Sequence, residues 1–310
     1  MLKLWHFVVL SLGISHQVDA TCQQRQSIGF INQVLLLEDL AQLSSEHMSG
    51  RKTGSVGSAK AQSYLQKRYK QIGLSSFAAY PEYLQAFSFS SSDSPGVNIL
   101  GLVKGQNFPD RFIIVTAHYD HLGKKGHKVF YGADDNASGV ATLLALAAKT
   151  AEVPLAHSVI FLATDAEEKG LYGAKAFVKQ LPIPHNSLLL NINLDMLGYG
   201  GRKNRLYATH SRGDKNLKKL VANVANLAPL CLINGHRKST RFRLFDEKIN
   251  WRKSSDHWAF GEGGFRYIFL GGGVHKNYHT TEDKFENIEQ DFYVSASEAA
   301  WLILQAADAD

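Results

Sequence analysis

The sequence predicts an α/β protein built on a mostly parallel mixed sheet that is covered by helices on both faces. Nearly continuous apolar segments of strand length recur along the chain. Amphipathic segments of helical length alternate with them. This alternation is typical of a sheet that is buried on both sides. No internal repeat or low-complexity tract interrupts it.

The helices and strands follow one another in a regular order. We expect helices at 30–45 and 61–73, where Gly73 is a stop signal, and extended segments within 80–105. The later strands are predicted at 111–120, 157–168, 187–197 and 265–273, and the later helices at 136–152, 171–181, 216–228 and 290–307. A chain of 310 residues can bury a large core, so residues 21–310 are expected to form a single domain.

The first twenty residues differ in character from the rest. Lys3 precedes the apolar run "LWHFVVLSLGI", and "SHQVDA" provides a small-residue cleavage site after Ala20. The run is too short to span a bilayer comfortably. We therefore predict that residues 1–20 are a cleaved signal peptide and that the mature protein is secreted or periplasmic, without a stable membrane anchor.

Cysteine usage and charge restrict the environment and the partners. Cys22 and Cys231 are the only cysteines. An even pair in an exported protein favours a disulfide, and two unrelated thiols are the alternative. The net charge is +6, but the basic residues are scattered along the chain and form no stripe with interleaved aromatics. Nucleic-acid binding is therefore not expected.

Potential metal ligands gather where the predicted strands end. "HYD" at 118–120, "DAEE" at 165–168 and Asp195 close three of the strands. "GADDNASG" at 132–139 lies between the first two, and "YHTTED" at 278–283 follows the last. Ligands bind outside the carboxyl ends of the strands in such sheets, so we expect these side chains to meet in one pocket.

The chemistry of this set favours two zinc ions. Carboxylates that crowd together raise one another's pKa unless a cation neutralises them. Two imidazoles with three or four carboxylates suit Zn²⁺ and, less well, Co²⁺ or Mn²⁺. Five ligands are too many for one tetrahedral zinc that keeps an open position, and they suit two ions that share a bridging carboxylate.

These segments together resemble a known family. "HYD", "GADDNASG", "EEKGLYG", "NLDM", "SDH" and "YHTTED", in this order, are similar to the secreted co-catalytic di-zinc aminopeptidases, which include bacterial leucyl-type enzymes and are related to glutaminyl cyclases. The motifs span 118–283. The resemblance implies a zinc aminopeptidase-like fold and an exopeptidase that removes N-terminal residues from peptides with a free N-terminus, using a hydroxide shared by the two ions.

The resemblance also implies a role for each ligand. His118 and Asp195 would bind one zinc, and Glu168 and His279 the other. Asp135 would bridge the two ions. The peptide bond that follows Asp135 is commonly cis in this family.

Three further residues complete the implied site. Glu167 would be the general base, because two adjacent glutamates cannot easily both reach the same ion. Asp120, on the same strand face as His118, would orient that imidazole. Tyr278 would donate to the tetrahedral oxyanion, with simple packing as the alternative.

Other polar residues nearby are expected to have different roles. His121 is predicted to point away from the site as an ordinary loop histidine, and Asp134 to cap the helix that follows it. Asp256 and His257 would support the pocket floor, with a capped helix start as the alternative. The glycines at 271–273 would let the backbone approach the metals, unless they form a plain loop.

Two other functions are open on the sequence. The alternative enzyme is a glutaminyl-peptide cyclotransferase, which uses a single zinc. Relatives of that class tend to have a tryptophan before the late histidine and to lack "GADD", so Tyr278 and "GADDNASG" favour the peptidase. A receptor ectodomain that only binds would have lost ligands that are all present here. The sequence does not predict the preferred N-terminal residue or the oligomeric state.

Overall fold

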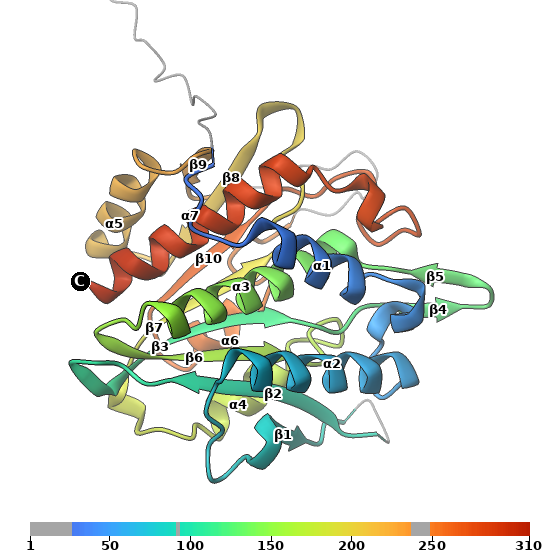
Figure 1. Cartoon of the computed structure of the whole chain (residues 1–310), viewed down its shortest axis with the longest axis horizontal. Coiled ribbons are helices and arrows are strands. Elements are labelled where there is room, and N and C mark those ends of the chain that lie inside the picture. The colour runs from blue at the N-terminus through green and yellow to red at the C-terminus, as the bar shows by residue number, and fades with distance from the viewer. Residues whose placement is uncertain (1–26, 91–93, 237–248) are drawn as a thin grey trace, which may run out of the picture.

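The computed structural model describes residues 27–90, 94–236 and 249–310. An eight-stranded sheet crosses the molecule with the strand order β1-β2-β6-β3-β7-β10-β8-β9 (Figure 1). Its strands are β1 (Leu84–Phe87), β2 (Gly96–Val103), β3 (Phe108–His118), β6 (His157–Thr164), β7 (Leu188–Asp195), β8 (Arg205–His210), β9 (Cys231–Asn234) and β10 (Tyr267–Gly271). Strands β6, β3, β7 and β10 pair in parallel. The central strands thus confirm the mostly parallel mixed sheet.

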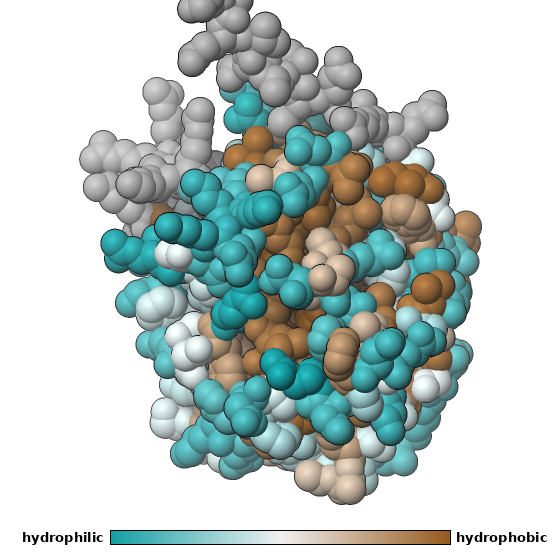
Figure 2. Space-filling view, turned by 90° about the vertical axis from the view of Figure 1, so that its left-hand side faces the viewer, coloured by the Kyte–Doolittle hydropathy of each residue, from teal (hydrophilic) through white to brown (hydrophobic). Residues whose placement is uncertain are grey.

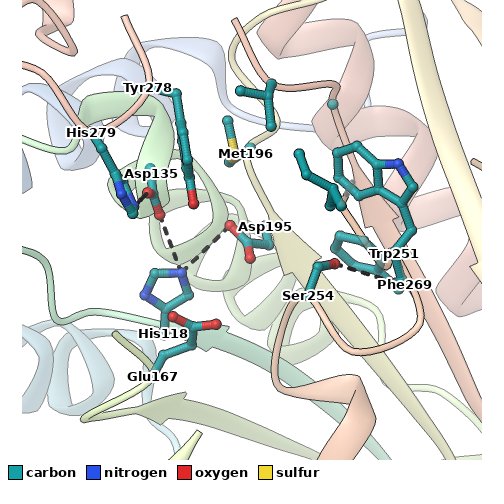
Figure 3. A pocket seen from close by; sticks show the side chains of 13 residues that line it. His118, Asp135, Glu167, Asp195, Met196, Trp251, Ser254, Phe269, Tyr278 and His279 are labelled. Carbon is teal, nitrogen blue, oxygen red and sulfur yellow. Dashed lines mark hydrogen bonds and ion pairs between the residues drawn. The ribbon is translucent and has the colours of Figure 1, made fainter. Parts of the chain in front are cut away.

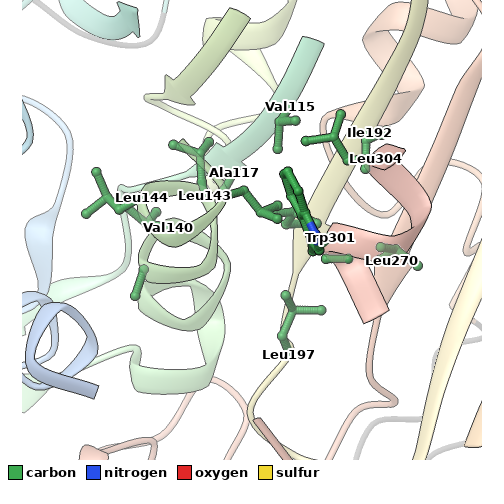
Figure 4. Packing of buried hydrophobic residues seen from close by; sticks show 14 of the residues in the cluster. Val115, Ala117, Val140, Leu143, Leu144, Ile192, Leu197, Leu270, Trp301 and Leu304 are labelled. Carbon is green, nitrogen blue, oxygen red and sulfur yellow. The ribbon is translucent and has the colours of Figure 1, made fainter. Parts of the chain in front are cut away.

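Helices cover both faces of this sheet. They are α1 (Gln33–Leu43), α2 (Val56–Ile72), α3 (Gly139–Glu152), α4 (Tyr172–Lys179), α5 (Lys215–Ala225), α6 (His257–Glu262) and α7 (Gln290–Asp308). Helices α1, α2, α3 and α7 lie on the front face in Figure 1, and α4 and α6 lie behind the strands. The largest apolar cluster fills the space under the front helices, where Trp301 of α7 packs against strand residues such as Ile192 and Leu270 (Figure 4).

Local sequence signals explain where the helices begin and end. The Ser55 side chain accepts a hydrogen bond from the amide of Ser58 at the start of α2. Gly73 ends the same helix in the left-handed conformation, with φ of 87°, where glycine has no steric penalty. Asn32 caps α1 as Ser55 caps α2, because its side chain accepts a hydrogen bond from the amide of Leu35. The stop predicted at Gly73 is thus confirmed.

The segment before α1 is tied to the last helix. The buried Glu298 carboxylate in α7 accepts hydrogen bonds from the amides of Ile28, Gly29 and Phe30 at 2.8, 2.6 and 3.1 Å. It also accepts one from the Ser27 hydroxyl at 2.8 Å. These four donors satisfy a carboxylate that would otherwise be costly to bury. The two ends of the described chain therefore stabilise each other.

Several elements were not expected from the sequence. Strands β8 and β9 extend the sheet beyond β10, and β4 (Gly123–Lys125) and β5 (Lys128–Phe130) form a separate hairpin that projects from the molecule (Figure 1). Helix α6 starts at His257, as the alternative interpretation of "SSDHWAF" proposed, but the Asp256 side chain does not cap it. The central strands also end earlier than predicted: β3 stops at His118 and not at residue 120, β6 at Thr164 and not at 168, and β7 at Asp195 and not at 197.

Two predictions fall at the N-terminus. Residues 1–20, the predicted signal peptide, lie outside the described residues, and so does Cys22. Its predicted partner, Cys231, is buried at the start of β9. Among the described residues, no helix combines the length and the apolar character needed to cross a bilayer.

The two ends of the sheet carry different surfaces. The carboxyl ends of the parallel strands point toward the side from which the β4–β5 hairpin projects (Figure 1). On the opposite side, hydrophilic residues surround smaller hydrophobic patches (Figure 2). The predicted ligands all belong to segments that begin at the carboxyl ends, so the fold collects them at one edge of the sheet.

Candidate metal centre

The predicted ligands meet at the carboxyl ends of β3 and β7. Figure 3 shows four of them, His118, Asp135, Asp195 and His279. His118 is the last residue of β3 and Asp195 the last of β7. Their positions follow directly from parallel pairing, because neighbouring strands end at the same edge. The other three are Asp135 in the turn before α3, Glu168 in the turn after β6 and His279 in the loop after β10.

A first group of donors surrounds the His118 imidazole. Its Nε2 lies 3.4 Å from Asp135 Oδ1 and 3.5 Å from Asp195 Oδ1. One donor atom from each of the three buried side chains lies within 4.8 Å of the others. Separations of this size suit three ligands that converge on one ion.

A second group shares Asp135 with the first. His279 Nε2 lies 3.0 Å from Asp135 Oδ2 and 3.4 Å from Glu168 Oε2. The two oxygens of Asp135 therefore face different groups, as a bridging carboxylate does. The Asp135–Asn136 peptide bond is cis, which agrees with the expectation drawn from the resemblance.

His121 does not point away from the site, so that prediction was wrong. The side chain is buried, and its Nδ1 lies 2.8 Å from Glu168 Oε1 and 3.8 Å from Asp135 Oδ2. Donor atoms of His121, Asp135 and Glu168 lie within 4.8 Å of one another. The prediction failed because it extended the side-chain alternation of a strand to a residue beyond the end of β3.

The donor set fits a metal ion. Glu168 Oε1 and Asp195 Oδ1 are buried and have no hydrogen-bond partner in the part of the chain that the structure describes. Unpaired buried polar atoms are costly, and a cation would satisfy these. Imidazole nitrogens and carboxylate oxygens are ligands that zinc accepts. Burial and the Asp135 charge act to raise the pKa of Glu168, but the nearby imidazoles of His121 and His279 outweigh them and hold that pKa at about 2.

Asp120 contacts the site differently from the prediction. Its backbone carbonyl lies 3.1 Å from His118 Nδ1, whereas its carboxylate Oδ1 is 3.8 Å away from the same nitrogen. The carboxylate accepts hydrogen bonds from the amides of Glu167 and Glu168 at 3.0 and 3.3 Å. Asp120 thus positions the backbone of both glutamates, and its main chain contacts the imidazole.

Glu167 and Tyr278 line the same cavity as His118, Asp135, Asp195 and His279 (Figure 3). Burial raises the pKa of the Glu167 carboxyl well above its usual range, since it disfavours the charged form more than the nearby His118 charge favours it. The Tyr278 hydroxyl points into the cavity in Figure 3, and its ring stacks on His279 with centroids 3.8 Å apart. Burial raises the pKa of Tyr278, so this hydroxyl remains a hydrogen-bond donor.

Asp134 is not a helix cap, and that prediction was also wrong. Its Oδ1 accepts from the amide of Gly198 at 2.6 Å, and its Oδ2 faces His275 Nε2 at 2.9 Å. Asp283, the last residue of "YHTTED", accepts from the amides of Asp134 and Asp135 at 2.8 and 3.0 Å. We predicted no role for His275 or Asp283 from the sequence, although Asp283 belongs to the motif "YHTTED".

Asp256 and His257 lie behind the cavity wall. The Asp256 carboxylate accepts a hydrogen bond from the Thr164 hydroxyl, and burial raises its pKa to about 6. The His257 ring stacks on Phe269 with centroids 4.4 Å apart. Phe269 lines the cavity, so His257 supports the wall from behind.

The cavity beside the ligands has a volume of about 350 Å³. One wall carries the polar groups described above (Figure 3). The opposite side of the cavity in Figure 3 carries Trp251, Phe269 and Ser254. The apolar side chains of Met196, Ile249 and Val274 also line the cavity. Gly272 is a further lining residue, and an added Cβ there would come within 2.9 Å of the Met196 carbonyl oxygen. Gly271 and Gly272 thus lie close to neighbouring groups, whereas an added Cβ at Gly273 would meet no described atom within 4 Å, and a close approach of this backbone to a metal stays a prediction.

Comparisons with known proteins agree with this geometry. The sequence model of a family described as Peptidase family M28 matches residues 98–304. The chain is 31% identical over 222 residues to aminopeptidase YwaD of Bacillus subtilis, which covers 67% of this chain and 43% of that protein. It is 28% identical over 212 residues to a probable zinc metalloprotease of Pyrenophora teres f. teres, with 63% and 44% covered. The chain thus spans less than half the length of these relatives.

Solved structures share the fold. A zinc aminopeptidase of Bacillus subtilis, BSAP, aligns over 88% of this chain and 95% of its own with a TM-score of 0.69 and 18% identity. LapB of Legionella pneumophila aligns over 90% of this chain and 73% of its own with a TM-score of 0.68 and 19% identity. The zinc aminopeptidase-like fold is thereby confirmed.

Proposed function

Because the chain belongs to peptidase family M28, we propose that it is a zinc-dependent aminopeptidase that hydrolyses N-terminal residues from peptides. The observation that carries the proposal is the position of Asp135 between two groups of buried donors. A bridging carboxylate of this kind is the mark of a two-metal hydrolytic site.

Two zinc ions per chain would occupy the site. His118 and Asp195 would hold one ion, Glu168 and His279 the other, and Asp135 both. Zinc, when bound, lowers the pKa of a coordinated water toward about 7 and polarises a carbonyl group. The distances among the donors support this assignment.

The other residues of the cavity would transfer protons and stabilise negative charge on the substrate. Glu167 would take a proton from the attacking water and deliver it to the leaving amine, as a general base and then acid does. Its position in the cavity wall and its raised pKa support the second step. Tyr278 would donate a hydrogen bond to the oxygen that becomes negatively charged. Asp120 would hold the main chain of both glutamates.

The cavity would select the substrate. The apolar side chains that line the cavity would take an apolar N-terminal side chain, because burying it there releases water from both surfaces. The carboxylates around Asp135 would attract the free α-amine. Such an enzyme acts on peptides outside the cytoplasm if residues 1–20 are removed during export, and we propose a secreted or periplasmic location on the sequence of that segment.

Metal content and two substrate classes test this function. Purified full-length protein should contain about two zincs per chain and release nitroaniline from aminoacyl-4-nitroanilides, fastest with apolar residues. An N-acetylated substrate is the control and should not be cleaved. One zinc with cyclisation of glutaminyl peptides would instead indicate the cyclotransferase, and protein without metal or turnover would indicate a binding protein.

A further inference from the structure

The surroundings of His121 suggest a role that the pattern of paired ligands does not include. The side chain is 1% exposed and lies beside Glu168 and Asp135. Among the described residues, neither of its ring nitrogens has a hydrogen-bond partner. A buried imidazole without hydrogen-bond partners is costly. A purely structural role for His121 therefore does not explain why its ring is buried here.

The contact with Glu168 has the character of two ligands that face one ion. His121 Nδ1 and Glu168 Oε1 are only 2.8 Å apart, yet both atoms lack the alignment of a hydrogen bond. Asp135 Oδ2 lies 3.8 Å from the same His121 nitrogen. Donor atoms of His121, Asp135 and Glu168 lie within 4.8 Å of one another, a spacing that suits three ligands of one ion.

The backbone beside the His121 ring leaves space for it. Gly132 lies against it, and an added Cβ at that position would come within 2.6 Å of two His121 ring atoms. Gly132 also has a φ of 59°, which glycine adopts without strain. The turn before α3 thus presents Asp135 while leaving a slot for the imidazole.

We infer that His121 is an additional ligand of the ion held by Glu168, His279 and Asp135. This inference rests on the proposed two-zinc site. It gives the two halves of that site, one for each ion, different sets of ligands. The half around His118 has one imidazole, whereas the other has two, His121 and His279, whose rings lie 5.8 Å apart. Since zinc favours imidazole nitrogen, the half with two imidazoles binds its ion more tightly.

Metal titration of His121→Gln tests this inference without reference to turnover. Full-length protein is stripped with a chelator and titrated with Zn²⁺ against a chromophoric chelator, and then with Co²⁺ while the visible spectrum is recorded. Wild-type protein should bind two ions with unequal affinities. In His121→Gln, the tighter affinity should fall by more than about 100-fold, beyond the usual effect of an outer partner, and the Co²⁺ bands should shift.

Two further variants control the experiment. His157→Gln removes an imidazole that contacts Asp308 at the amino end of β6, and it should titrate as wild type. His121→Phe keeps the ring volume if the glutamine variant fails to fold, and it should lose the same affinity. If His121→Phe or His121→Gln binds two ions with the wild-type affinities and spectrum, the inference is overturned. The proposed function would then remain intact. Wild-type protein that binds no ion would overturn both.

Discussion

At the scale of single residues, the site depends on which atoms of each side chain are already engaged. The Asp120 carboxylate is occupied by the amides of Glu167 and Glu168, so it fixes the turn that presents them. Glu168 keeps one buried oxygen free for a cation. Glu167 faces the cavity and has a raised pKa because of burial. We therefore expect the adjacent residues Glu167 and Glu168 to have different roles.

Replacing Glu167 should separate metal binding from hydrolysis. Glu167→Gln keeps the shape of the side chain but removes its capacity to accept and return a proton. We expect kcat to fall by about 10²–10⁴-fold with an unchanged zinc content, because general acid–base catalysis contributes an effect of that size. Steady-state kinetics on a leucyl-4-nitroanilide and elemental analysis measure the two quantities. Wild-type turnover in this variant would exclude Glu167 as the base.

At the scale of elements, the loop after β10 is held to the turn before α3. Asp283 accepts from the amides of Asp134 and Asp135, and His275 contacts the Asp134 carboxylate. The first contact fixes the main chain of the bridging residue, and both fix the loop that carries His279. The two halves of the candidate metal centre are thus aligned by hydrogen bonds outside it.

Asp283→Asn should weaken this alignment. An asparagine oxygen can accept from one of the two amides, and its NH₂ group would face the other. We expect a loss of about 1–3 kcal/mol in the free energy of unfolding, the cost of an unsatisfied buried donor, and a zinc affinity lower by about 10–100-fold. Urea unfolding and metal titration measure these effects.

The matched control for Asp283→Asn is Glu282→Gln in the same loop. Glu282 makes an exposed ion pair with Lys284 at 3.3 Å, and such pairs contribute little. Equal losses in the two variants would show that Asp283 does not align the site.

At the scale of the whole molecule, polar groups are buried behind the cavity as well as in it. His236 and His257 lie in an aromatic stack with Trp251 and Phe269. Burial lowers the pKa of each of the two imidazoles to about 3. The folded protein therefore keeps both rings neutral, whereas the unfolded chain protonates them below about pH 6.5.

This difference predicts a dependence of stability on pH. The folded pKa values are depressed, so the stabilisation is complete above about pH 6.5 and is lost as the pH falls toward 3. His257→Phe should reduce the proton uptake on unfolding in this range by about one. Urea unfolding at several pH values measures it. The exposed His127→Gln variant should keep the wild-type slope, and an unchanged slope in His257→Phe would contradict the explanation.

Much of the fold was predictable because local rules govern it. The apolar runs and helical periodicities placed the central strands and the long helices, including the stop at Gly73. Strands β8 and β9 were missed because they are short, with 6 and 4 residues, and only part of each is buried, so neither forms a long apolar run. The five residues predicted as ligands could be singled out because each follows a strand or borders a glycine-rich turn.

The sequence by itself determined the central strands and the long helices, the residues predicted to gather at the carboxyl ends, and the resemblance to two-zinc peptidases, since all three depend on local pattern. Only the tertiary structure decided which atoms meet. It turned His121 toward Glu168 and engaged Asp134 with His275. The reason is physical: beyond the end of a strand no periodic rule fixes the direction of a side chain, and its direction is set by packing against residues far away in the sequence.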